Sequence, residues 1–176
     1  MNDNKSLSFS QAIQATQSLM DKINLQKLNE VDIEKEVASI VSTKNGGRGF
    51  FVAYLTSNLS LPDKPSPGII QGLKLKSSEK IVSDLLVKNL AMSSAMTVTH
   101  TRNNDVDNIQ GSQRVYRRTS NIIQQINLDS IKEELKKLEA TIADEDGEYN
   151  DFLERWGYDV QQQQAIKRAI ADTLVW

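Results

Sequence analysis

The fold class depends on one stretch of the sequence, Gly49–Thr56, which reads GFFVAYLT. Its β-branched and aromatic side chains favour a strand, whereas the amphipathic patterns on either side favour a short buried helix. A strand needs a partner for its backbone donors and acceptors, and the only other β-like run is Thr97–Thr101. We therefore predict a helix here, and a small two-stranded element of residues 50–56 and 97–101 is the minor alternative.

Helical patterns fill most of the remaining chain. Apolar side chains recur three and four residues apart, Asp105 and Asp159 stand where helix N-caps are expected, and Gly157 stands where a helix should stop. These patterns cover residues 9–23, residues from 32 to the stop at 45–47, a short helix that begins at Pro67, and residues 77–102, 105–126, 131–142, 148–156 and 160–174. We predict an all-α bundle of about seven helices, with a main bundle over residues 1–126. Residues 127–176 form a C-terminal helical segment or hairpin packed on the same domain.

A glycine-rich run, Gly46-Gly47-Arg48-Gly49, precedes the deciding stretch. Glycine tolerates the left-handed conformation that ends helices, so we predict a tight turn between two helices. A backbone nest for an anion is the alternative, because a helix that begins at Phe50 would point its N-terminal amides at the same place. The spacing of the run matches neither the P-loop nor the dinucleotide-binding pattern.

The composition excludes much familiar chemistry. The chain has 176 residues, of which 39% are hydrophobic and 25% charged, as in an ordinary globular protein. It has no Cys and one His, which argues against thiol catalysis, disulfides, zinc sites and histidine bases. We expect no catalytic residues, no metal site and no cofactor. Residues 1–6 lack a signal-peptide pattern, and the longest apolar run, Phe50–Leu55, is too short to cross a membrane. The sequence therefore predicts a cytoplasmic protein without a membrane partner.

The net charge of −2 conceals an uneven distribution. Residues 44–118 hold 11 Lys and Arg against 5 Asp and Glu, whereas residues 119–176 hold 6 against 12. These blocks carry +6 and −6, and either they pack against one another within the molecule or they attract a partner. Helix-spaced arginines in the basic block are compatible with phosphate binding. The candidate anion- or nucleic-acid-binding residues are Arg48, Lys74, Lys76, Arg114, Arg117 and Arg118.

Aromatic side chains are concentrated near the C-terminus. We expect them to form the core of the C-terminal hairpin, and an exposed subset would make a patch for docking a partner protein. The candidate docking residues are Tyr149, Phe152, Trp156 and Tyr158.

Three stretches, GGRGFFVAYL at 46–55, SDLLVKNLAM at 83–92 and GSQRVYRR at 111–118, resemble an uncharacterised family of conserved hypothetical proteins from cyanobacteria. The resemblance covers residues 8–126 or so. It implies a soluble protein of the cyanobacterial cytosol and a more variable C-terminal segment, and it brings no activity with it.

These observations lead to three hypotheses about function. The favoured one is a small non-enzymatic interaction or regulatory protein that binds another protein through helical faces and segregated charge. The alternative is an anion- or nucleic-acid-binding module that uses the basic middle block, although a sequence pI of 5.5 argues against it. An enzyme that relies on carboxylate, Lys, Tyr or Arg chemistry is least favoured. Homo-oligomerisation through a wide apolar helix face stays open.

Overall fold

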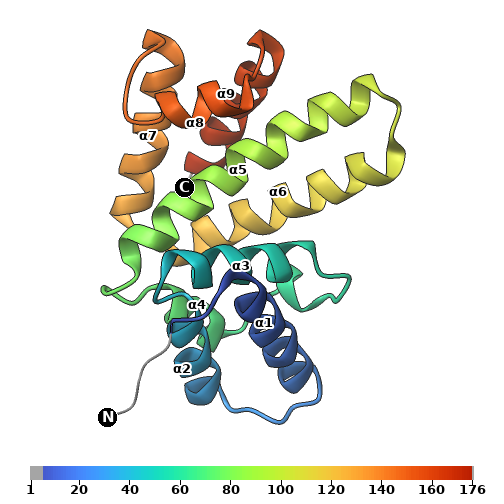
Figure 1. Ribbon diagram of the computed structural model, residues 1–176, viewed down its shortest axis with the longest axis vertical. Coiled ribbons are helices and arrows are strands. Elements are labelled where there is room, and N and C mark those ends of the chain that lie inside the picture. Colours follow the sequence, from blue (N-terminus) through green and yellow to red (C-terminus); the bar gives the residue numbers. More distant parts are fainter. Residues whose placement is uncertain (1–5, 176) are drawn as a thin grey trace. The chain divides into compact units, whose positions relative to one another are not determined.

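The computed structural model describes residues 6–175, and every regular element in that range is helical (Figure 1). The all-α prediction is confirmed. The α-helices are α1 (Phe9–Asn24), α2 (Glu30–Ile40), α3 (Lys44–Thr56), α4 (Pro67–Leu73), α5 (Glu79–Arg102), α6 (Val106–Ile126), α7 (Asp129–Asp144), α8 (Asn150–Trp156) and α9 (Val160–Leu174), and Leu61–Asp63 forms a 3₁₀ turn. The described part of the chain thus has nine helices instead of about seven, and α4 and α8 are short, with seven residues each.

The stretch that decides the fold class lies in α3. Within residues 6–175 there is no strand, and Thr97–Thr101 belongs to α5, so the two-stranded alternative is wrong. A helix satisfies the backbone groups of a buried segment internally, while its aromatic side chains pack outward into the core. The Phe50 and Tyr54 rings stack with centroids 5.2 Å apart, and the Phe51 ring meets the Phe50 ring edge-on at 5.3 Å.

The glycine-rich run does not form the predicted turn between helices. Gly46, Gly47 and Gly49 are helical residues of α3, whose N-cap is Thr43. The amides of Gly46 and Gly47 donate to the hydroxyl and the carbonyl oxygen of Thr43, respectively, so the anion nest is also not formed. Gly49 instead allows α3 to pack closely against α1, because a Cβ at this position would lie 2.5 Å from the Cβ of Ala12 in α1.

A second pair of glycines lets α4 approach α2. A Cβ at Gly72 would lie 2.7 Å from the Cβ of Val37, and one at Gly68 would meet the backbone and side chain of Glu30. The Gly68 amide also donates to the Glu30 carboxylate. Glycines four residues apart on one helix face therefore place the backbones of α2 and α4 in direct contact.

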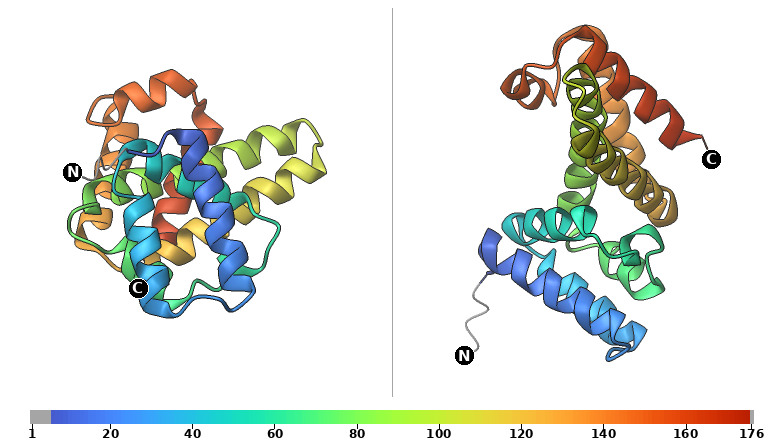
Figure 2. Two further views of the ribbon diagram at one scale, coloured as in Figure 1. Left: turned by 60° about the horizontal axis from the view of Figure 1, so that its bottom comes forward. Right: turned by 90° about the vertical axis from the view of Figure 1, so that its right-hand side faces the viewer.

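The chain divides into two compact units, unit 1 (Met1–Leu85) and unit 2 (Leu86–Trp176). In unit 1, α1 packs chiefly on α3, and α2 packs on α4 (Figure 2). In unit 2, α9 contacts both α6 and α7, while the C-terminal part of α5 runs antiparallel beside α6 (Figures 1 and 2). The division lies inside α5, whereas the sequence pattern suggested a boundary near residue 126.

Helix α5 resembles a membrane span in length and composition, and it is the only such helix in the described residues. Half of its apolar window is buried inside the structure. Buried positions along it include Val82, Leu86 and Leu90, each with no exposed surface. Such burial is typical of a core helix.

Candidate functional site

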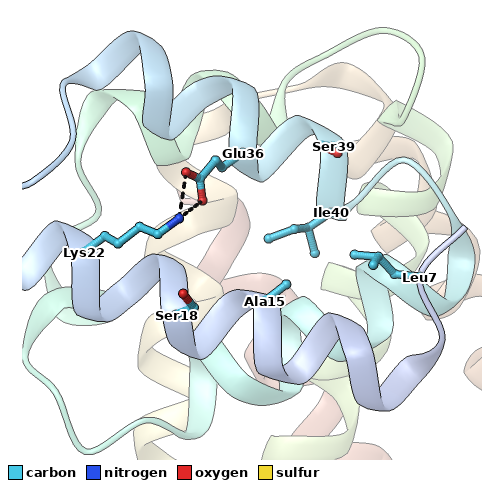
Figure 3. Close-up of a pocket in the computed structure, with 7 residues that line it drawn as sticks. All are labelled: Leu7, Ala15, Ser18, Lys22, Glu36, Ser39 and Ile40. Atoms are coloured by element: carbon cyan, nitrogen blue, oxygen red, sulfur yellow. Dashed lines mark hydrogen bonds and ion pairs between the residues drawn. The ribbon is translucent and has the colours of Figure 1, made fainter. Parts of the chain in front are cut away.

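Unit 1 contains an open cleft of about 350 Å³ between α1 and α2 (Figure 3). This volume lies near the lower end of the range of about 300–1,000 Å³ that is common for ligand pockets. The lining residues are Leu7, which precedes α1, Ala15, Ser18 and Lys22 from α1, and Glu36, Ser39 and Ile40 from α2.

Helical spacing explains which residues of α1 line the cleft. Ala12, Thr16 and Leu19 are buried, as helix positions three and four residues apart must be when they face a core. Ala15 and Ser18 lie on a neighbouring face of the same helix, and both have small side chains. Because α1 packs mainly on α3 and α2 packs mainly on α4, these small side chains leave the space between α1 and α2 open.

One ion pair spans the cleft. The Lys22 Nζ lies 3.2 Å and 3.3 Å from the two carboxylate oxygens of Glu36, as Figure 3 shows. The two side chains are 43% and 35% exposed, so solvent screens the pair and its net contribution to stability is small. The pair also leaves the cleft lining without net charge.

The six candidate anion-binding residues are divided between the two units. In unit 1 the Arg48 guanidinium lies over the Phe9 ring, 5.2 Å from its centroid, and Lys74 caps the C-terminal end of α4. The Lys76 ammonium lies 3.2 Å from a Glu79 carboxylate oxygen, although its side chain is 94% exposed.

The other three candidates lie on α6 but do not share an exposed face. Arg117 is exposed and Arg114 is half-buried, whereas Arg118 is buried, with only 3% of its surface accessible. A buried guanidinium cannot neutralise a phosphate in solution without moving outward. The structure therefore does not present the three arginines as one exposed stripe.

Three of the four candidate docking aromatics form a cluster inside unit 2. Phe152 contacts Tyr149 and Tyr158 edge-on, with ring centroids 6.3 Å and 6.2 Å away, and the Lys88 Nζ lies 5.9 Å from the Phe152 centroid. The Tyr149 hydroxyl donates to a Glu134 carboxylate oxygen at 2.7 Å.

The tyrosine and tryptophan near the end of α8 differ sharply in burial. Tyr158 is 7% exposed, and its hydroxyl is buried without a hydrogen-bond partner. That burial raises the pKa of the Tyr158 hydroxyl to about 12. Trp156, by contrast, is 49% exposed, so it is the member of the predicted set that faces solvent most openly.

The basic and acidic blocks of the sequence meet in unit 2 at a contact between Arg102 and Asp159. The Arg102 guanidinium at the end of α5 donates to both carboxylate oxygens of Asp159, at 2.6 Å and 3.1 Å. Asp159 also caps α9, and Gln162 of that helix donates to the Thr99 hydroxyl at 2.9 Å. This contact joins α5 to the start of α9 across 57 residues of sequence.

This contact predicts a measurable change in acidity. Hydrogen bonds from the Arg102 side chain, and then from the Gln162 amide, lower the pKa of the Asp159 carboxyl to about 2. Because the folded pKa lies below the ordinary value of 3.8, the contact stabilises the fold above about pH 4 and is lost as the pH falls through 2. In Arg102→Gln we expect the Asp159 pKa to rise towards 3.8, as measured by carboxyl carbon NMR during a pH titration. An unchanged pKa in this variant would show that the ion pair does not form in solution.

Metal-ligating groups are scattered over residues 6–175, where no three His, Asp or Glu side chains gather into a potential metal site. His100 has a carboxylate in its neighbourhood, with its Nδ1 4.0 Å from an oxygen of Asp105. That carboxylate mainly bonds Asn108, which lowers its pKa. The pair lies at the turn between α5 and α6.

The chain matches the family described as Uncharacterised conserved protein UCP020893 over residues 8–173. The match extends beyond the resemblance seen in residues 8–126 and includes the C-terminal helices. No curated protein and no solved structure matches the chain.

Proposed function

We propose that this chain, which belongs to the family of Uncharacterised conserved protein UCP020893, is a small non-enzymatic protein that binds a helix of another protein in the cleft between α1 and α2. The open cleft is the observation that carries this proposal. We also propose, from the resemblance of three stretches to cyanobacterial sequences, that it acts in the cyanobacterial cytosol.

The lining of the cleft supports a helical ligand. Its walls are two helices, and the α1 positions 15, 18 and 22 repeat at the spacing of a coiled-coil seam. Leu25 continues this spacing and is 59% exposed. An amphipathic helix that lies in such a groove buries an apolar stripe against both walls. Small side chains at Ala15 and Ser18 allow the backbone of that helix to approach closely.

The nucleic-acid alternative is less well supported. Its arginines on α6 include the buried Arg118, and Arg48 and Lys76 already contact Phe9 and Glu79. Phosphate binding relies on several exposed cations that act on one backbone together.

Filling the cleft tests the proposal. Ser18 lies on the cleft wall and is exposed, whereas its neighbour Gln17 is exposed but does not line the cleft. Phenylalanine at either position adds the same side chain to the same helix, and only Ser18→Phe obstructs the cleft. We expect affinity capture from lysate of the native cells to recover at least one stoichiometric protein with the unaltered chain and with Gln17→Phe. The amount of that protein captured by Ser18→Phe should be at least about tenfold lower.

Far-UV circular dichroism of both variants should match that of the unaltered chain, which shows that the added ring does not unfold α1. Two results would contradict the proposal. One is equal capture of every protein by the three chains, and the other is the recovery of no stoichiometric protein at all.

A further inference from the structure

We infer that unit 2 has a binding surface of its own, made by Trp156, Val160 and the carboxylates of residues 144–159, and that it binds a basic protein segment with apolar side chains. We call it the acidic tryptophan surface. It does not depend on the cleft function proposed above, because it lies in the other unit of the chain.

Two large apolar side chains anchor this surface. Trp156 is 49% exposed at the end of α8, and Val160 is 69% exposed at the start of α9. Only a tight turn separates them, in which Gly157 adopts the left-handed conformation with φ of 59°. Tyr149 and Tyr158 in the same region are buried, so the fold uses those aromatics internally and leaves the indole in solvent. Tryptophan is one of the side chains that are enriched among the residues that dominate the binding energy of protein interfaces.

The exposed charges in the segment that holds these anchors indicate the chemistry of the ligand. Residues 144–159 contain one cation, Arg155, against seven carboxylates, which are Asp144, Glu145, Asp146, Glu148, Asp151, Glu154 and Asp159. Glu148 pairs with Lys137, and Asp159 pairs with Arg102. The stretch itself has a net charge of −6, which the cations of Lys137 and Arg102 reduce to −4, so it still attracts cations and repels phosphates.

A basic segment with apolar side chains complements both features. Its apolar groups cover the indole and Val160, while its Lys and Arg side chains lie over the carboxylates and speed the encounter. Nucleic acids and anionic lipid surfaces share the negative charge of this surface, so they are not its ligands.

Fluorescent peptides test this inference on the full chain. The probe is a helical peptide of Leu and Lys, and the comparison peptides replace Leu by Ala or Lys by Glu. In a Trp176→Phe background, we expect the Leu and Lys peptide to shift the emission of Trp156 to shorter wavelength with saturation. Its binding, followed by anisotropy, should weaken at least about tenfold between low salt and 0.5 M salt, because the attraction is largely electrostatic.

Two variants and two controls locate the binding. We expect Trp156→Ala to lower the affinity for the Leu and Lys peptide about thirtyfold, which is the effect of losing one residue that dominates the binding energy of an interface. The double variant Asp151→Asn and Glu154→Gln should lower the affinity for this peptide several-fold and make the affinity less dependent on salt. Val52→Ala, an exposed apolar side chain of unit 1, should leave the affinity unchanged. Ser18→Phe in the cleft should do so too, which separates a failure of the cleft proposal from a failure of this one.

Three outcomes would overturn the inference. The first is that the peptide with Glu in place of Lys binds the chain as tightly as the Leu and Lys peptide does. The second is that Trp156→Ala binds the Leu and Lys peptide with unchanged affinity. The third is that no peptide changes its anisotropy up to about 100 μM, a concentration well above the dissociation constants of specific protein complexes.

Discussion

Replacing Gly49 by alanine is expected to lower the free energy of unfolding by about 3 kcal/mol, the upper part of the range for overpacked sites. The added Cβ would lie 2.5 Å from the Cβ of Ala12, 2.7 Å from the carbonyl oxygen of Phe9 and 3.0 Å from the amide nitrogen of Ile13. Two of these atoms belong to the backbone of α1, so no side-chain rotation relieves the contact. The helices α1 and α3 must move apart, and the packing between them is lost. Urea denaturation followed by circular dichroism at 222 nm measures the change.

Gly111 provides the matched control for this substitution. It also lies within a helix, α6, but a Cβ there would have no neighbour within 4 Å. Gly111→Ala should therefore raise the free energy of unfolding by about 1 kcal/mol, through helix propensity alone. If both variants changed stability in the same direction, close approach at Gly49 would not be the reason for its glycine.

Local signals in the sequence were sufficient to predict the helices. The predicted caps at Asp105 and Asp159 accept hydrogen bonds from the amides of Asn108 and Gln162, and Gly157 ends α8 with a positive φ. These features depend only on residues within one turn of each other. For the same reason the amphipathic patterns located most elements to within a few residues, although α3 begins at Lys44, inside the region that was predicted as a turn.

Glycine was harder to interpret because one residue type serves two purposes. Gly157 and Gly147 have positive φ, as expected where a chain turns. Gly47 and Gly49 are helical, and the reason for their small size is a neighbouring element that is distant in sequence, whereas helical Gly46 is crowded by Ile40 just before it in the chain. A single sequence contains no signal that separates these cases, except the spacing of Gly68 and Gly72, which is typical of a helix face in close contact.

The candidate sites depended on tertiary burial, which the sequence does not encode locally. Tyr149 and Trp156 belong to the same aromatic cluster in sequence, yet Tyr149 is 4% exposed and Trp156 is 49% exposed. Likewise Arg117 is exposed and its neighbour Arg118 is buried. The cleft was missed because it is formed by faces of α1 and α2 that look like ordinary polar faces. Only the small side chains at Ala15 and Ser18 hinted at a space there.

Phe50→Ala is expected to lower the free energy of unfolding by about 4 kcal/mol, which makes it the most destabilising single substitution that we predict. The Phe50 side chain has no exposed surface, and its ring contacts both Phe51 and Tyr54 within α3. Truncation removes this apolar area from the core and leaves a cavity that rigid neighbouring rings cannot fill. Phe50→Leu, which keeps most of the volume, should cost under about 1.5 kcal/mol.

The same helix supplies a control for Phe50→Ala, since Val52 is 44% exposed. Val52→Ala should change stability by less than about 0.5 kcal/mol in urea denaturation, because a surface site loses little packing and alanine favours a helix. The contrast also tests the conformation of the deciding stretch. In a strand, residues 50 and 52 would lie on one face and would be buried or exposed together, whereas in a helix they are about 200° apart. Similar losses for Phe50→Ala and Val52→Ala would therefore contradict the helix itself, and with it the all-α fold.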